Sequence, residues 1–170
     1  MIDRKLINKN NIDIIVCFGY PNIIPKKIIK SVTCINIHGG ILPFNRGPNP
    51  HLWAWVNGLK HGVSIHYIDD GVDTGDIIET SDILFDSNET LKSSFDKLID
   101  ECENLFSKTW PTFRSGNSKR NAQHPDINVQ AHTLKSQEPL SQLFTEEWQH
   151  KPISEFVKEA KGILRKSEKS

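Results

Sequence analysis

The sequence predicts an α/β protein with a mainly parallel sheet, followed by a short C-terminal helical extension. Three observations predict this fold. Short runs rich in β-branched residues alternate with helical segments, the order found in sheets covered by helices. These runs are apolar on both faces, as in buried parallel strands. From Glu89 onward, apolar residues recur at three- and four-residue steps, the period of an amphipathic helix.

Four strands are expected in the first half of the chain. The runs at residues 12–18 and 32–37 are short, apolar and β-branched, and glycines follow each of them. Residues 62–68 form a third such run, and a fourth strand is predicted to begin within residues 76–80. Turn-forming residues follow the first three runs, which fits strands that end at one edge of a sheet.

Helices are predicted between the strands and after them. Short helices are expected at residues 26–31 and 52–57. The long amphipathic helix begins near Glu89, where Asp86 and Glu89 have the spacing of a capping box. Pro111 is expected to end this helix, because the residue before a proline disfavours helical backbone angles.

The second part of the chain is predicted to be an extension of the first. Residues 115–130 are rich in Asn, Ser and Gln, which indicates a loose connector. Pro152 is expected to begin a last helix that frays near Gly162, before a disordered lysine-rich tail. We therefore predict a catalytic core at residues 1–114, and a connector and helical extension at residues 115–170.

The charge balance argues against several classes of partner. Lys plus Arg and Asp plus Glu each number 21, so the net charge is zero. A nucleic-acid or anionic-membrane binder normally carries a basic surface, and this sequence does not predict one. The first residues do not resemble a signal peptide, and no apolar run is long enough to span a membrane. A cytoplasmic protein without nucleic-acid or membrane partners is therefore expected.

Cysteine and histidine spacing predicts no metal or redox site. Cys17, Cys34 and Cys102 lie far apart, and the first two sit in apolar runs that predict burial. The histidines show no pattern typical of metal ligands. His66 is interpreted as a strand residue that supports Asp73. No phosphate-binding glycine motif is present, so nothing indicates ATP or NAD chemistry.

Three polar residues are the candidate catalytic group. Asn36 and His38 alternate at the end of a predicted strand, so their side chains point the same way. Asp73 lies in a loop flanked by Gly71 and Gly75, which are expected to permit unusual backbone angles. Ligands of α/β sheets bind at the carboxyl ends of strands, where these segments converge. Residue types alone leave a structural interpretation open: a capping asparagine, a core histidine and a turn aspartate.

The three residue types suit acyl transfer to an amine. Asn36 and a protonated His38 would donate hydrogen bonds to the developing oxyanion. Asp73 would orient His38, raise its pKa and help to move the proton.

The residues around this group resemble the folate-dependent formyltransferase family. The resemblance lies in residues 35–43, in Arg46-Gly47, and in residues 62–78, where a histidine precedes Asp73 by seven residues. It implies a partial Rossmann-like domain that transfers a formyl group from 10-formyltetrahydrofolate to a primary amine. It also implies that Asn36, His38 and Asp73 are the catalytic residues. The pterin pocket that it implies is lined by Phe18, Tyr20, Ile24, Ile68 and Asp70.

Within the family, the sequence most resembles amino-sugar N-formyltransferases. Residues 43–47, Asn49-Pro50 and Trp53 carry this likeness, which implies a nucleotide-linked amino sugar as the amine. Arg46 and Asn49 would then contact the sugar nucleotide, and Trp53 would stack on it or simply pack in the core.

Two departures from the family keep alternatives open. Many members carry a serine where this chain has Gly40. Members also have a fuller nucleotide-binding half before the strand that begins near residue 13. Without that half the sheet would have an unprotected edge, so a homo-oligomer is expected to cover it. The alternatives are formylation of another small amine, of the glycinamide ribonucleotide or methionyl-tRNA type, and a catalytically silent remnant that binds folate or a partner.

Overall fold

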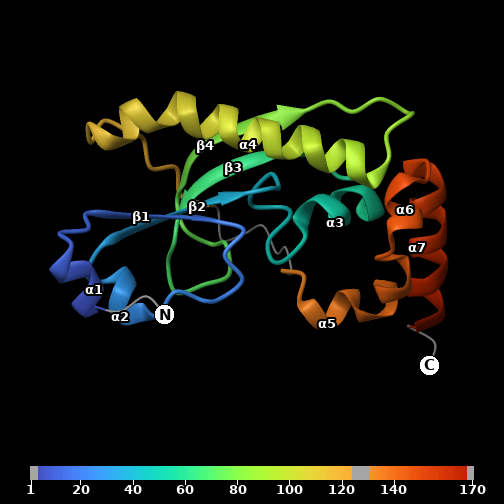
Figure 1. Ribbon diagram of the computed structural model, residues 1–170, viewed down its shortest axis with the longest axis horizontal. Coiled ribbons are helices and arrows are strands. Elements are labelled where there is room, and N and C mark those ends of the chain that lie inside the picture. The colour runs from blue at the N-terminus through green and yellow to red at the C-terminus, as the bar shows by residue number, and fades with distance from the viewer. Residues whose placement is uncertain (1–3, 124–130, 168–170) are drawn as a thin grey trace.

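The computed structural model describes residues 4–123 and 131–167, which form one mixed sheet with helices packed around it (Figure 1). The sheet has the order β1-β2-β3-β4, with strands at Ile14–Phe18, Thr33–His38, His61–Tyr67 and Ile77–Ile83. The predicted α/β class and all four predicted strands are confirmed. Within the described residues, no helix is both long and apolar enough to cross a membrane.

The prediction of a mainly parallel sheet is wrong, because one of the three strand pairs among the described residues is parallel. β1 pairs parallel with β2, whereas β2–β3 and β3–β4 are antiparallel. β3 and β4 are joined by residues 68–76 alone, without a helix. A connection this short reverses the chain, because a parallel pair needs a crossover of a dozen or more residues. Residues 68–76 are called the Asp73 loop below.

The parallel pair is covered by two short helices near the N-terminus. These are α1, at Arg4–Lys9, which the sequence did not predict, and α2, at Lys26–Ile29. Buried side chains from both helices pack against the strands and form one apolar cluster of Ile7, Cys17, Ile24, Ile28, Val32 and Cys34. Burial raises the pKa of Cys17, and it raises that of Cys34 to about 11, so both thiols stay protonated at neutral pH.

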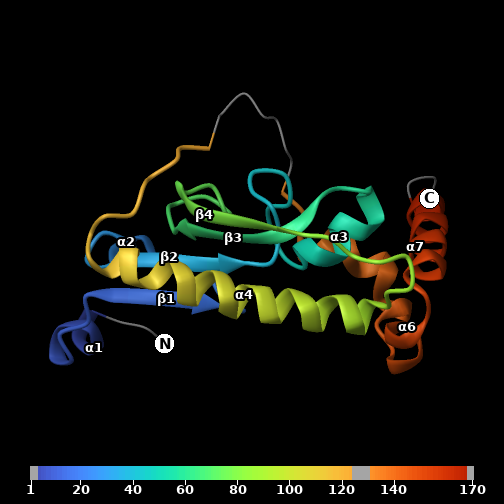
Figure 2. The ribbon, with the colours of Figure 1, turned by 90° about the horizontal axis from the view of Figure 1, so that it is seen from above.

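The long helix α4, at Leu91–Arg114, runs along the sheet (Figure 2). Its buried stripe of Leu98, Cys102, Leu105 and Phe113 packs on side chains from β2, β3 and β4. Thr90 and Ser93 form the capping box, rather than the expected pair of Asp86 and Glu89.

α4 also continues through Pro111, contrary to prediction. Proline inside a helix removes one hydrogen bond and costs about 3 kcal/mol. The bond that Pro111 cannot donate would go to the carbonyl of Ser107, an exposed residue that water can solvate. Packing of Phe113 one half-turn later, at 8% exposure, offsets the cost.

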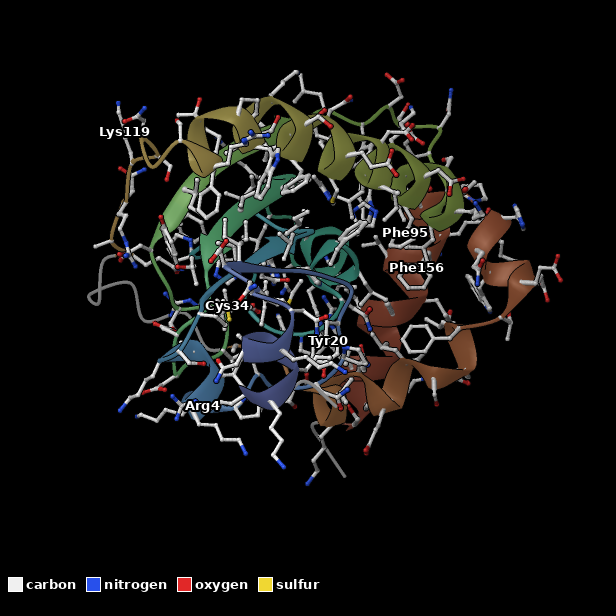
Figure 3. All side chains as sticks on the ribbon, turned by 60° about the vertical axis from the view of Figure 1, so that its left-hand side comes forward. Arg4, Tyr20, Cys34, Phe95, Lys119 and Phe156 are labelled. Atoms are coloured by element: carbon white, nitrogen blue, oxygen red, sulfur yellow. The ribbon has the colours of Figure 1, made fainter. Side chains whose placement is uncertain are left out.

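The C-terminal elements pack on α3, at Pro50–Asn57, and form a second apolar cluster. They are α5 (Leu134–Gln137), the 3-10 helix η1 (Glu138–Leu143), α6 (Glu146–His150) and α7 (Ile153–Ser167). Phe156 of α7 is fully buried in this cluster (Figure 3). The helix that was expected to fray at Gly162 continues to Ser167, because Ile163 and Leu164 still pack on the cluster. The boundary between residues 114 and 115 stays a prediction.

Candidate active site

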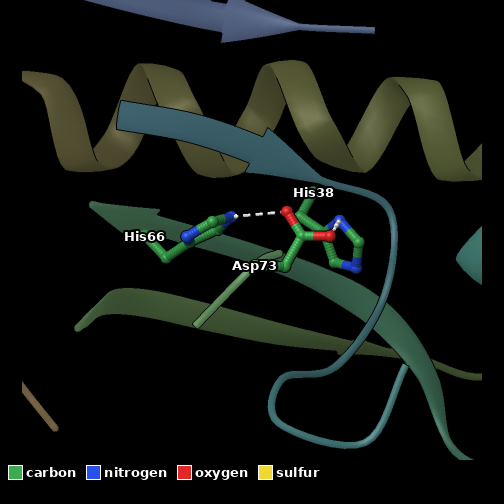
Figure 4. A group of neighbouring side chains, drawn as sticks. All are labelled: His38, His66 and Asp73. Carbon is green, nitrogen blue, oxygen red and sulfur yellow. Dashed lines mark ion pairs between the residues drawn. The ribbon is translucent and has the colours of Figure 1, made fainter. Parts of the chain in front are cut away.

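The end of β2 and the Asp73 loop bring the three predicted polar side chains together, and Figure 4 shows two of them, His38 and Asp73, beside His66. Asp73 Oδ1 lies 3.5 Å from Asn36 Nδ2, and Asp73 Oδ2 lies 3.7 Å from His38 Nδ1. The expected convergence of the two segments is therefore confirmed. The catalytic roles of the three residues stay a prediction.

His66 is a fourth member of this group. It lies directly opposite Asn36 in the antiparallel register of β2 and β3. Its Nδ1–H donates to the carbonyl of Tyr67 at 2.8 Å, since a carbonyl oxygen only accepts. Its Nε2 therefore faces Asp73 Oδ1, at 3.4 Å, and Asn36 Nδ2, at 3.3 Å. This geometry agrees with the interpretation of His66 as a support for Asp73.

The Asp73 loop holds its aspartate in an unusual backbone conformation. Asp73 itself has φ +52°, in the left-handed region, whereas Gly71 and Gly75 do not have positive φ angles. The expectation that these glycines supply unusual angles is thus wrong, and they are needed for space instead. A Cβ at Gly75 would lie 1.9 Å from the Tyr67 carbonyl oxygen, and one at Gly71 would lie 2.0 Å from Thr74 Oγ1.

Asp73 is ionised despite its burial. Burial alone would raise its pKa, but three neighbours together outweigh that effect and lower the pKa to about 2. They are His66, His38 and the backbone N–H of Gly47, which donates to Asp73 Oδ2 at 2.9 Å. The carboxylate is therefore a permanent negative charge in the site at neutral pH.

His38 does not carry the charge that the sequence predicted. Burial lowers its pKa, and the opposing effects of Asp73 and the Asn45 carbonyl do not overcome this. Its Nε2–H donates to the Asn45 carbonyl at 2.7 Å, so the neutral ring has its Nδ1 lone pair on the side of Asp73. In this structure His38 is thus placed to accept a proton rather than to donate one to an oxyanion.

Gly40 belongs to the same packing around His38. A Cβ at Gly40 would lie 2.7 Å from the Cβ of Pro50 and 3.2 Å from His38 Nε2. A serine here would require the neighbouring residues to shift, which explains why this chain has glycine.

The ligand atoms of His38, His66 and Asp73 lie within 4.8 Å of one another. They are close enough for a metal ion, and both imidazoles donate their other N–H to a carbonyl, as metal-bound histidines do. The two ring nitrogens form ion pairs with Asp73 when the rings are protonated, so a proton can take the place of an ion between them.

A cleft of about 160 Å³ opens beside Asn36, His66 and Asp73. Of the five residues expected to line a pterin pocket, four line this cleft: Tyr20, Ile24, Ile68 and Asp70. Phe18 is not among its lining residues, because side chains alternate along β1 and Cys17 takes the inward position. The lining combines apolar side chains with polar and acidic ones, a mixture that suits a flat, partly polar ring system.

The three residues expected to contact the substrate lie outside the lining of this cleft. The Arg46 guanidinium donates to Gln123 Oε1, and Asn49 Nδ2 donates to Gln137 Oε1 at 2.7 Å. Trp53 is buried and stacks on His132, with ring centroids 3.9 Å apart. Trp53 and His132 line a second, open groove of about 550 Å³.

Gln123 and the Gly47 amide are contacts of Asp73 that sequence reasoning missed. Gln123 lies in the predicted loose connector, where the polar composition gave no sign of a fixed position. Residues 120–123 are in fact fixed: Asn121 exchanges two backbone hydrogen bonds with Ile77, and Gln123 bonds to the Asp73 loop. The last part of the predicted connector, residues 124–130, lies outside the described residues.

The comparisons with known proteins agree on one family. The family named Formyl transferase matches residues 3–109. The crystal structure of the formyltransferase PseJ from Anoxybacillus kamchatkensis, in complex with UDP-4,6-dideoxy-4-formamido-L-AltNAc and tetrahydrofolate, aligns with a TM-score of 0.81. It is 35% identical, over 91% of this chain and 81% of that chain.

Curated relatives include two substrate classes. Methionyl-tRNA formyltransferase of Clostridioides difficile is 34% identical over 128 residues, which are 72% of this chain and 41% of that protein. A dTDP-4-amino-4,6-dideoxyglucose formyltransferase of Mycobacterium bovis is 31% identical over 119 residues, 69% of this chain and 51% of that protein. The chain therefore spans about two fifths to one half of the length of these relatives.

Proposed function

Because the chain belongs to the formyl transferase family, we propose that it transfers a formyl group from 10-formyltetrahydrofolate to the amino group of a nucleotide-linked amino sugar. The observation that carries this proposal is the arrangement of Asn36, His38 and Asp73 beside a cleft with mixed apolar and polar walls. An ionised carboxylate, a neutral imidazole and an amide donor are the groups that formyl transfer to an amine requires.

Asn36 stabilises the negative charge that develops on the formyl oxygen. When the amine attacks the formyl carbon, the carbonyl electron pair moves to this oxygen, which then needs a hydrogen-bond donor. Asn36 Nδ2 contacts His66 and Asp73 only at 3.3 and 3.5 Å. Contacts this long are readily exchanged for a shorter bond to an oxyanion. Such a donor is worth about 3 to 4 kcal/mol in other oxyanion sites.

Asp73 and His38 together take the proton that the attacking amine must lose. Asp73 lines the cleft, and His38 lies behind it. A proton on His38 Nδ1 points at an ionised carboxylate while Nε2–H keeps its bond to the Asn45 carbonyl. The pair then returns this proton to the nitrogen of the folate as the carbon–nitrogen bond breaks, which gives the formamide and tetrahydrofolate.

The cleft would hold the pterin ring of the formyl donor. Tyr20, Ile24 and Ile68 supply apolar surface for its faces, and Asp70 supplies a polar group at the rim. Lys26 forms an ion pair with Asp70, which keeps this carboxylate in place.

An amino sugar is the preferred acceptor because the likeness to PseJ extends over 91% of this chain and 81% of that chain. On this proposal the sugar nucleotide binds on the side of the site formed by Arg46, Asn49 and Trp53. Arg46 and Trp53 are linked there through His132, whose amide donates to the Arg46 carbonyl and whose ring stacks on Trp53. The second candidate is methionyl-tRNA, because that relative is equally similar in sequence. The zero net charge does not favour it. A cytoplasmic location and a homo-oligomer remain predictions.

The test is release of tetrahydrofolate from 10-formyltetrahydrofolate with a panel of amines. The panel contains UDP- and dTDP-linked amino sugars, glycinamide ribonucleotide and methionyl-tRNA, each assayed with the natural protein and with Asp73→Asn. Release that depends on an amino-sugar nucleotide and is lost in the variant supports the proposal. Release only with methionyl-tRNA or the ribonucleotide would reassign the acceptor. No release from a folded chain would favour a silent, folate-binding remnant.

A further inference from the structure

Gln123 contacts the Asp73 loop from a distant part of the sequence. Its Nε2 donates to the carbonyl oxygens of Asp73, at 2.9 Å, and Gly75, at 2.7 Å. Its Oε1 accepts from Arg46 Nε and Nη2, at 3.1 and 2.6 Å. Both amide hydrogens and the amide oxygen are therefore used. The reverse orientation would set the amide oxygen against two carbonyls, so the network fixes this side chain.

These bonds act at the strained point of the loop. Asp73 has φ +52°, a conformation that costs a non-glycine residue about 1 kcal/mol or more and persists only where surrounding contacts hold it. Gln123 donates hydrogen bonds to the carbonyl of Asp73 itself and to the carbonyl of Gly75. The backbone angles at Asp73 set the direction of its carboxylate, so a contact that fixes these angles also aims the side chain.

We propose that Gln123 is a positioning residue: it holds the backbone of the Asp73 loop so that the Asp73 carboxylate faces the two histidines. This inference rests on the proposed function only for its catalytic consequence. The carboxylate receives the Gly47 amide at 2.9 Å, and Gly47 follows Arg46, which Gln123 also binds. Gln123 thus joins the two segments that meet at Asp73.

General anchoring of the connector is carried by the neighbouring residues. Arg120 Nε forms an ion pair with Asp76 at 3.0 Å, and its guanidinium lies over the Tyr67 ring at 3.8 Å. Asn121 exchanges backbone hydrogen bonds with Ile77. These contacts fasten the connector to the ends of β3 and β4, and Gln123 is the residue in this stretch that bonds to Asp73 itself.

Three substitutions separate these roles. Gln123→Glu is close in shape and keeps an acceptor for Arg46, but its carboxylate cannot donate to the two carbonyls. Gln123→Met removes donor and acceptor without adding charge, and serves as the second variant if Glu prevents folding. Arg120→Gln is the matched control, because it removes contacts of the same segment that do not reach Asp73.

The first readout is amide hydrogen exchange at Gly47, whose N–H reports the position of the Asp73 carboxylate without any need for turnover. The amide of His132, which donates to the Arg46 carbonyl at 3.0 Å, is the internal reference. In Gln123→Glu we expect exchange at Gly47 to accelerate about tenfold or more, with little change at His132 or in Arg120→Gln. Unchanged exchange at Gly47, or equal acceleration at both amides, would overturn the proposal.

The second readout is the split between kcat and KM. Misplacement of a catalytic group by about 1 Å lowers the rate by up to about a hundredfold, so kcat of Gln123→Glu should fall by about tenfold to a hundredfold. KM for the formyl donor should stay within about threefold, because the substituted residue is not among those lining the cleft. An active natural protein whose Gln123→Glu variant keeps its kcat would refute the positioning role. If the natural protein turns over no amine, the proposed function fails, while the exchange result still decides the role of Gln123.

Discussion

Replacement of Asp73 by asparagine tests the central charge of the site. The neighbours of Asp73 lower its pKa from 3.8 to about 2, which corresponds to about 2 kcal/mol in favour of the ionised form. An ionised group with a lowered pKa stabilises the fold above its ordinary pKa, and this stabilisation is lost as the pH falls through about 2. Asp73→Asn should therefore be less stable by up to about 2 kcal/mol at pH 7, with a smaller difference in acid.

The variant should nevertheless keep the shape of the site. An asparagine oxygen can accept from the Gly47 amide in place of Asp73 Oδ2, and its amide group can donate to His66 Nε2, which faces Asp73 Oδ1 at 3.4 Å. Tetrahydrofolate should therefore bind with nearly the affinity of the natural protein. What the variant lacks is the carboxylate that attracts a proton to His38, and general acid–base groups of this kind contribute about 10²- to 10⁴-fold to the rate.

The assay is single-turnover formation of the formamide product, together with tetrahydrofolate affinity and urea unfolding at pH 7. The control is Asp76→Asn, which removes a carboxylate at the end of the same loop that pairs with Arg120 instead of the histidines. We expect the single-turnover rate constant to fall only in Asp73→Asn. If Asp73→Asn turned over at the natural rate, or if both variants lost activity equally, the assigned role of Asp73 would be wrong.

Three further predictions follow from the packing and the electrostatics. Burial and the neighbouring His61 lower the pKa of His51 from 6.5 to about 3, so between these two pH values the unfolded chain takes up a proton that the folded chain does not. The contribution of His51 to stability should therefore fall by about 1.4 kcal/mol per pH unit from about pH 6 to about pH 3, and urea unfolding of His51→Leu should show a flatter pH dependence. Gly75→Ala should lower the stability of the folded protein by at least about 2 kcal/mol in thermal unfolding, because the new Cβ would meet the Tyr67 carbonyl. The control Gly58→Ala should cost only about 1 kcal/mol, because Gly58 has φ +66° but a Cβ there would have no atom within 4 Å. Treatment with EDTA should leave tetrahydrofolate release unchanged, because hydrogen bonds and proton transfer account for the proposed reaction. If EDTA abolished the activity and zinc restored it, a metal ion would instead be assigned to His38, His66 and Asp73.

Local patterns were sufficient to locate the strands and the convergence of the three polar residues. The strands are short apolar runs, and their side-chain period of two sets Asn36 and His38 on one side without any knowledge of the rest of the chain. The resemblance favoured a catalytic role for the three residues, which residue types alone did not distinguish from a capping asparagine, a core histidine and a turn aspartate.

Features that depend on distant contacts were not predictable in this way. The charge of His38 depends on how deeply the ring is buried, and the sequence does not give that depth. The continuation of α4 through Pro111 depends on the packing of Phe113, which overrides the local preference. The position of Gln123 depends on a bond to a loop some 50 residues earlier in the chain, inside a stretch whose composition indicates no structure.

The antiparallel pairing that the sequence missed is also what completes the site. A parallel β2–β3 pair would carry the chain away from the end of β2 by way of a crossover. The antiparallel register instead sets His66 opposite Asn36, and the short Asp73 loop then turns back over the end of β2. Asp73 thereby meets one histidine from each of the two strands, at 3.7 and 3.4 Å. His38, His66 and the Gly47 amide together lower the pKa of this carboxylate, so the strand order supplies two of the three groups that keep it ionised.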